Sequence, residues 1–183
     1  MKKKSKTLVV NFCAGPGAGK SSMAASVFSH LKWKNVECEL VTEFAKDLVW
    51  EHRHKTFDDQ IYMFAKQYHR IYRLMNQVDV VVTDSPILLT PIYDLERRQT
   101  LKNLVLEEFN KVHNFNIFLT RKKKYQPKGR NQNEEQAKEK DREIKTFLEE
   151  NGIPYVQIDG TNESVDVIVN TITTTLKAIH EGK

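Results

Sequence analysis

The chain has 183 residues, a length that favours one domain with a full hydrophobic core over residues 1–183. Hydrophobic residues make up 39% of the sequence and charged residues 29%, and no run of about 18 apolar residues occurs, which excludes a membrane-spanning segment. The net charge of +5 is typical of a protein with a polyanionic partner, either a nucleotide or a nucleic acid.

Two further features indicate a cytoplasmic protein. The apolar run that follows the basic start at 1–6 is too short for a signal peptide. Cys13 and Cys38 have no metal-site spacing around them, and isolated free thiols are typical of a reducing compartment.

The predicted elements alternate between strand and helix along the chain. The first half is expected to contain a strand at 8–12, a helix at 19–33, a strand at 36–41, and helices at 42–50 and 58–77. The second half is expected to contain a strand at 78–84, a helix ending near Asn110, a strand at 115–120, a helix at 134–151, a strand at 154–159 and a helix at 165–180. This alternation predicts an α/β fold of three layers, with a five-stranded parallel sheet of order 2-3-1-4-5 and a mobile lid.

The first predicted strand runs into a glycine-rich segment that ends in Lys20-Ser21. Glycines let backbone N–H groups turn inward around a phosphate, and the following helix adds free N–H groups and its positive dipole end. Lys20 can reach the β- and γ-phosphates, and the Ser21 hydroxyl can ligate Mg²⁺. Ala14 stands where the G-x-x-x-x-G-K-[ST] pattern has its first glycine. The predicted ATP-binding residues are Gly15, Gly17, Ala18, Gly19, Lys20, Ser21 and Ser22.

Two carboxylates follow predicted strands at the same edge of the sheet. Asp84 ends the third strand, where it can hold Mg²⁺ through water; the alternative is an Asp that caps a helix after Ser85-Pro86. Glu43 follows the second strand and can accept a proton from a substrate hydroxyl; the alternative is a Glu favoured by the helix dipole. Which of the two carboxylates acts as the base stays open at this point.

The segment 121–133 carries six cations with one Pro and one Gly, which predicts an exposed loop. Arg121 and Arg130 border this loop and can close over the triphosphate as a lid. A solvated charge run is the favoured interpretation of Lys122, Lys123 and Lys124.

The helix at 58–77 offers two polar side chains for the substrate. Gln67 and Arg70 share one face of this helix by their i, i+3 spacing. They can read a base or a sugar, or they can belong to an exposed helical surface.

The motifs at 14–21, 42–46, 80–84 and 121–132 resemble those of P-loop nucleoside and nucleotide kinases, over nearly the whole chain. The likeness is closest to small ATP-binding kinases of bacteriophages and to ribosylnicotinamide-kinase-like domains. This resemblance implies that Glu43 acts as the base or binds the acceptor. It also implies that Arg121 and Arg130 are lid arginines. The loop 159–162, which contains Gly160, would lie near the adenine.

The expected function is ATP- and Mg²⁺-dependent transfer of the γ-phosphate to a nucleoside- or nucleotide-type acceptor. Because some phage members of the group resemble kinases of 5-hydroxymethyluracil in DNA, such DNA is an alternative acceptor. A switch or motor NTPase, or a nucleic-acid-binding module that holds ATP, is the alternative of another class. The expected location is the cytoplasm, that of the host if a phage encodes the chain, and the oligomeric state stays open. The expected catalytic residues are Lys20, Glu43, Asp84, Arg121 and Arg130.

Overall fold

Five parallel strands form a single sheet in the order β2-β3-β1-β4-β5, which confirms the order predicted from the sequence. The computed structural model of the protein describes residues 5–122 and 133–182. The strands are β1 (Leu8–Cys13), β2 (Cys38–Val41), β3 (Val80–Thr83), β4 (His113–Thr120) and β5 (Val156–Asp159). All five run in the same direction, so their carboxyl ends meet at one edge of the sheet.

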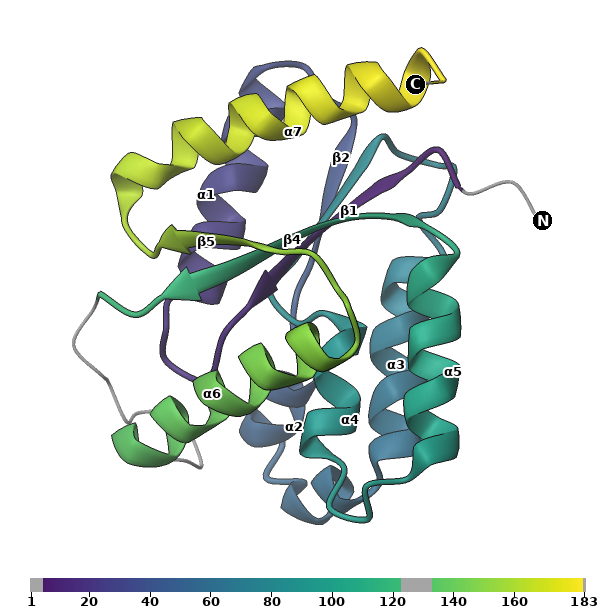
Figure 1. Cartoon of the computed structure of the whole chain (residues 1–183), viewed down its shortest axis with the longest axis vertical. Helices are drawn as coiled ribbons and strands as arrows, with labels where there is room; N and C mark the ends of the chain where they lie inside the picture. The colour runs from purple at the N-terminus through teal and green to yellow at the C-terminus, as the bar shows by residue number, and fades with distance from the viewer. Residues whose placement is uncertain (1–4, 123–132, 183) are drawn as a thin grey trace.

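Helices cover both faces of this sheet and complete the three layers (Figure 1). The helices are α1 (Lys20–Trp33), α2 (Phe44–Trp50), α3 (Gln60–Tyr72), α4 (Thr90–Tyr93), α5 (Gln99–Asn110), α6 (Glu134–Glu150) and α7 (Val165–His180). Helices α1 and α7 pack on one face, whereas α3, α5 and α6 pack on the other. Strand β1 is buried on both faces: Val10 and Phe12 point to the first core and Val9 and Cys13 to the second, as strand periodicity requires.

The expected helix before Asn110 is in fact two helices, and this prediction was wrong in that respect. Helices α4 and α5 are separated by the segment 94–98, in which Arg97 adopts a φ of 50°. A residue in that region of backbone space cannot continue a right-handed helix. Asp94 stabilises the break, because its Oδ2 accepts the backbone N–H of Arg98 at 2.8 Å and its Oδ1 accepts Nη2 of the same arginine at 2.6 Å.

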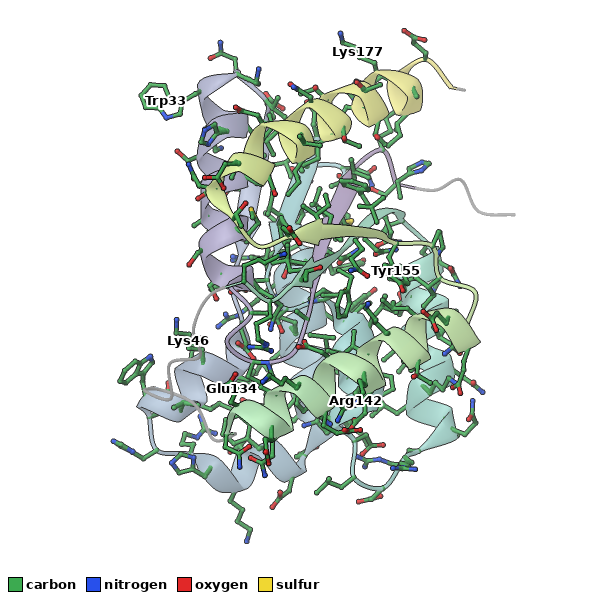
Figure 2. All side chains as sticks on the ribbon, turned by 60° about the vertical axis from the view of Figure 1, so that its left-hand side comes forward. Trp33, Lys46, Glu134, Arg142, Tyr155 and Lys177 are labelled. Atoms are coloured by element: carbon green, nitrogen blue, oxygen red, sulfur yellow. The ribbon has the colours of Figure 1, made fainter. Side chains whose placement is uncertain are left out.

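The labelled side chains show how α1 is oriented in the molecule. Trp33, at the end of α1, and Lys177, on α7, lie near the top of the view, whereas Lys46 of α2 and Glu134 of α6 lie somewhat below its middle (Figure 2). Because α1 begins at Lys20 and ends at Trp33, the glycine-rich loop lies at the end of α1 that is directed toward Lys46.

Two further predictions concern the lid and membrane-spanning segments. Most of the expected lid at 121–133, including Arg130, lies outside the described residues. None of the helices in the described part of the chain is both long enough and apolar enough to cross a bilayer.

Candidate active site

The glycine-rich loop joins the carboxyl end of β1 to the first turn of α1, as the sequence predicts. Gly17 and Gly19 have φ values of 76° and 101°, which side chains rarely tolerate. Gly19 occupies the N-cap position of α1 and has no side chain with which to satisfy the N–H groups of the first helical turn. This arrangement is the geometry with which helix N-termini bind phosphate groups. Ala14 is fully buried within the core beneath α1 and α7, where its methyl group packs against apolar neighbours.

The ammonium group of Lys20 lies across this loop. Its Nζ donates hydrogen bonds to the carbonyl oxygens of Ala14 at 2.8 Å and Gly15 at 3.1 Å. Burial lowers the pKa of Lys20, while the carboxylates of Glu43, Asp84 and Asp141 oppose this effect. Lys20 is therefore surrounded by three carboxylates that come from three different parts of the chain.

Glu43 and Asp84 lie side by side because they follow two adjacent strands. Strands β2 and β3 pair in parallel with Val41 opposite Thr83, so Asp84 lies one residue and Glu43 two residues beyond the paired positions, at the same edge of the sheet. Burial raises the pKa of Glu43, Lys20 opposes that rise, and Asp84 adds to it. Glu43 occupies the N-cap position of α2 but makes no side-chain cap.

Asp84 has an unpartnered oxygen in a buried position. Its residue is only 4% exposed, and its Oδ1 has no hydrogen-bond partner. The helix-cap alternative is not supported, because the turn after Pro86 has no side-chain cap and the N–H of Ser85 donates to Thr83 Oγ1. A buried carboxylate oxygen without a partner is costly unless a ligand or an ion satisfies it.

Arg121 points into the site from the end of β4, but it is paired with a residue that no sequence motif singles out. Its Nη2 lies 2.9 Å from Asp141 Oδ2, and its Nη1 donates to the carbonyl oxygen of Pro16 at 2.8 Å. Asp141, on α6, also accepts the backbone N–H of Gly15 through Oδ1 at 2.5 Å. Arg121 and α6 are thus both attached to the glycine-rich loop.

Gly160 lies against the same loop from the side of β5. Its N–H donates to the carbonyl oxygen of Thr120 at 3.0 Å, and a Cβ atom at Gly160 would lie 3.0 Å from the carbonyl oxygen of Ala18. Two backbone segments therefore approach each other closely at Gly160, and the predicted place of this residue near the adenine stays a prediction.

Gln67 and Arg70 share a face of α3, as their spacing predicts, and that face contacts the chain around Glu43. Gln67 is buried, with an amide that bonds to the backbone of Thr42 and Phe44. Arg70 donates to the carbonyl oxygen of Thr42 and pairs with Asp47. The alternative of an exposed helical surface is therefore wrong for Gln67.

Asp141 contacts the glycine-rich loop and Arg121, and neither it nor Tyr93 was predicted as a site residue from the sequence. Burial raises the pKa of Tyr93, and the negative charge of Glu43 adds to this rise. Tyr93 ends the short helix α4, which was predicted as part of one long helix. Asp141 is one of several acidic residues in the charged helix α6, and no local pattern distinguishes it from the others.

These elements define a P-loop protein with the fold of the nucleoside and nucleotide kinases. The model of the AAA domain family matches residues 9–164, and the chain belongs to that family. A search of curated proteins finds no match.

Two similar solved structures are of deoxyadenosine kinase from M. mycoides. The first, with bound dATP, is 20% identical, covers 90% of this chain and 99% of its own, and has a TM-score of 0.58. The second, with the products dCMP and a flexible dCDP, is 19% identical, covers 91% and 99%, and has a TM-score of 0.55. At this level of identity the likeness establishes the shared fold.

Proposed function

We propose that the protein is an ATP- and Mg²⁺-dependent kinase that transfers the γ-phosphate of ATP to a nucleoside- or nucleotide-type acceptor. The observation that carries this proposal is the placement of Glu43 and the unpartnered Asp84 beside Lys20, at the carboxyl edge of the sheet. Phosphoryl transfer needs positive charge at the phosphates and a group that positions the attacking hydroxyl. Lys20 would supply the positive charge, and Glu43 would position the hydroxyl. The kinase fold and the nucleotides bound by the M. mycoides enzyme support the same class of reaction.

The glycine-rich loop and Lys20 would bind the triphosphate. Backbone N–H groups from Gly17 to Ser22 hold the phosphate oxygens, and Lys20 exchanges its bonds to the carbonyls of Ala14 and Gly15 for contacts to the β- and γ-phosphates. Gly160 borders the nucleotide from the side of β5.

Glu43 would serve as the base in the transfer step. The acceptor hydroxyl oxygen attacks the γ-phosphorus, the bond to the β-γ bridging oxygen breaks and ADP leaves, while Glu43 takes the hydroxyl proton. Burial raises the pKa of Glu43, Lys20 opposes that rise and Asp84 adds to it.

Ser21 and Asp84 would hold Mg²⁺ at this site. The buried, unpartnered Oδ1 of Asp84 fits a hard cation that prefers oxygen ligands, and Ser21 adds a hydroxyl from the first turn of α1. Mg²⁺ commonly takes one or two protein ligands together with the substrate phosphates, and its charge offsets the negative charge of those phosphates.

A base within DNA is a second candidate acceptor, and one surface feature favours it. Glu43 precedes α2, and the last residue of that short helix, Trp50, is 63% exposed. Arg53 and Lys55 follow in the sequence and are also exposed, and Arg53 pairs with Glu51. Exposed aromatic rings and exposed cations are features of surfaces that bind the bases and phosphates of nucleic acids.

An acceptor screen with labelled ATP tests the proposal. Nucleosides, nucleotides and duplexes with 5-hydroxymethyluracil are each mixed with the protein and Mg²⁺, and transfer of label is measured. A kinase consumes ATP in step with the acceptor. A switch or motor NTPase hydrolyses ATP without one, and a nucleic-acid-binding module holds ATP without turnover. ATP hydrolysis that no acceptor changes would therefore contradict the kinase assignment.

A further inference from the structure

The amide of Gln67 holds the backbone on both sides of Glu43. Its Oε1 accepts the N–H of Phe44 at 2.9 Å, and its Nε2 donates to the carbonyl oxygen of Thr42 at 3.4 Å. Gln67 is 6% exposed, so these bonds form in a largely water-free position. A single buried side chain of α3 thereby bridges the residue before Glu43 and the residue after it.

Arg70 adds three contacts to the same turn. Its Nη1 donates to the carbonyl oxygen of Thr42 at 3.2 Å, and its Nη2 lies 2.5 Å from Asp47 Oδ2. The guanidinium carbon lies 5.2 Å from the centre of the Phe44 ring, within the range of a cation–π contact. Arg70 thus ties the end of β2 to the first turn of α2.

The turn depends on tertiary contacts for its position. Helix α2 has only seven residues, which is too short to be stable without tertiary contacts. Glu43 stands in an extended conformation at its N-cap, with φ −64° and ψ 121°, and makes no side-chain cap of its own. Side chains from α3 therefore fix the position of the Glu43 backbone.

We infer that Gln67 and Arg70 are positioning residues that hold Glu43 in place for proton transfer, rather than residues that recognise the acceptor. This inference rests on the proposed role of Glu43 as the base. The oxygen and the nitrogen of the Gln67 amide each already have a backbone partner. The guanidinium of Arg70 already contacts a carbonyl, a carboxylate and a ring. A group that acts by position affects the rate of the chemical step more than it affects acceptor binding.

The pair of variants Gln67→Leu and Gln60→Leu tests the inference. Gln60 lies on the same helix, is 8% exposed, and bonds to the carbonyl oxygen of Phe57, away from the Glu43 turn. Both substitutions remove a buried amide, so a general loss of stability affects both variants. We expect Gln67→Leu to lower kcat about 10- to 100-fold, because a misplacement of about 1 Å can cost about 100-fold, and to leave the acceptor KM nearly unchanged. Gln60→Leu keeps kcat close to that of the parent.

The outcomes separate the inference from the proposed function. A raised acceptor KM or a changed acceptor preference in Gln67→Leu, with kcat unchanged, overturns the positioning role. Faster hydrogen exchange at the Phe44 N–H in Gln67→Leu than in Gln60→Leu supports the bracing geometry without any activity measurement. If that exchange difference appears while Glu43→Gln keeps full activity, Gln67 does hold the backbone around Glu43, but the assignment of Glu43 as the base fails.

Discussion

Asp141 and Arg121 form a two-point ion pair, in which Nε and Nη2 of the arginine lie 3.3 Å and 2.9 Å from the same carboxylate oxygen, Oδ2. The other oxygen of Asp141 accepts the N–H of Gly15, and a Cβ atom at Gly15 would lie 2.4 Å from the carbonyl oxygen of Ala137. Helix α6 therefore approaches the glycine-rich loop so closely that only glycine fits at position 15. This approach makes α6 part of the proposed nucleotide site.

The first prediction concerns this ion pair. Asp141→Asn keeps the size of the side chain but leaves the largely buried guanidinium of Arg121 without its counter-charge. We expect a loss of about 1–3 kcal/mol in the free energy of unfolding, the usual effect of removing a charged partner from a buried hydrogen bond, together with weaker ATP binding. Denaturant unfolding and ATP titration measure the two effects. Glu139→Gln, on the exposed side of the same helix, is the control and should change stability by less than about 1 kcal/mol. Equal effects in both variants would contradict the role of Asp141.

The second prediction concerns Lys20. Lys20→Ala removes the ammonium group that lies across the glycine-rich loop, and with it a charge interaction with the transferred phosphate. We expect turnover to fall at least about 100-fold, as for other interactions made in the transition state, while the fold persists. Steady-state kinetics and circular dichroism measure these outcomes. Turnover close to that of the parent would remove the loop from the mechanism.

The third prediction separates the roles of Glu43 and Asp84. Glu43→Gln should lower turnover about 10²- to 10⁴-fold, the usual contribution of a general base, and should change ATP affinity little. The acidic limb that reports the raised pKa of Glu43 should disappear from its pH profile. Asp84→Asn should instead raise the Mg²⁺ concentration needed for half-maximal rate, because it alters the buried carboxylate that would hold the ion. If Glu43→Gln keeps the full rate while Asp84→Asn loses it, Asp84 is the base.

The fourth prediction uses the basic segment to separate the two classes of acceptor. Lys122 pairs with Asp159 at 3.1 Å in a half-exposed position, whereas Lys123, Lys124 and Arg130 lie outside the described residues. For a small acceptor, neutralising the three lysines together should change turnover little, whereas single changes at Arg121 or Arg130 should lower it.

For a DNA acceptor, the same lysine triple variant should bind DNA more weakly. The slope of log affinity against log salt should become shallower by roughly 0.9 for each DNA phosphate that the variant no longer neutralises. Binding of plain duplexes and of duplexes with 5-hydroxymethyluracil at two salt concentrations measures this slope. We expect the small-acceptor result; tight binding that is confined to the modified duplex and weakened in the triple variant would reverse that preference.

Local sequence was sufficient for the parts of the site that are contiguous in the chain. The glycine-rich loop, with Lys20 and Ser21 at its end, lies where the pattern predicts it, because an apolar strand, a run of glycines and a helix start are all encoded within a few residues. Glu43 and Asp84 were also found from the sequence, because parallel strands bring their carboxyl ends to one edge.

The limit of prediction from sequence is clearest on α3 and after β3. Helical spacing placed Gln67 and Arg70 on one face, but it could not indicate that this face meets the backbone around Glu43. The break at Arg97 was missed because the hydrogen bonds between Asp94 and Arg98 that stabilise it are not a periodic pattern.

The sequence by itself determined the strand order, the place of the glycine-rich loop and the P-loop kinase fold, since each depends on short-range patterns and on connection rules. Only the tertiary structure decided which polar side chains meet. Asp141 and Gly15 are 126 positions apart, and their hydrogen bond exists because α6 packs directly against the backbone of the loop. Periodicity fixes the face of a helix on which a charge lies, but the partner of that charge depends on which distant segment packs against that face.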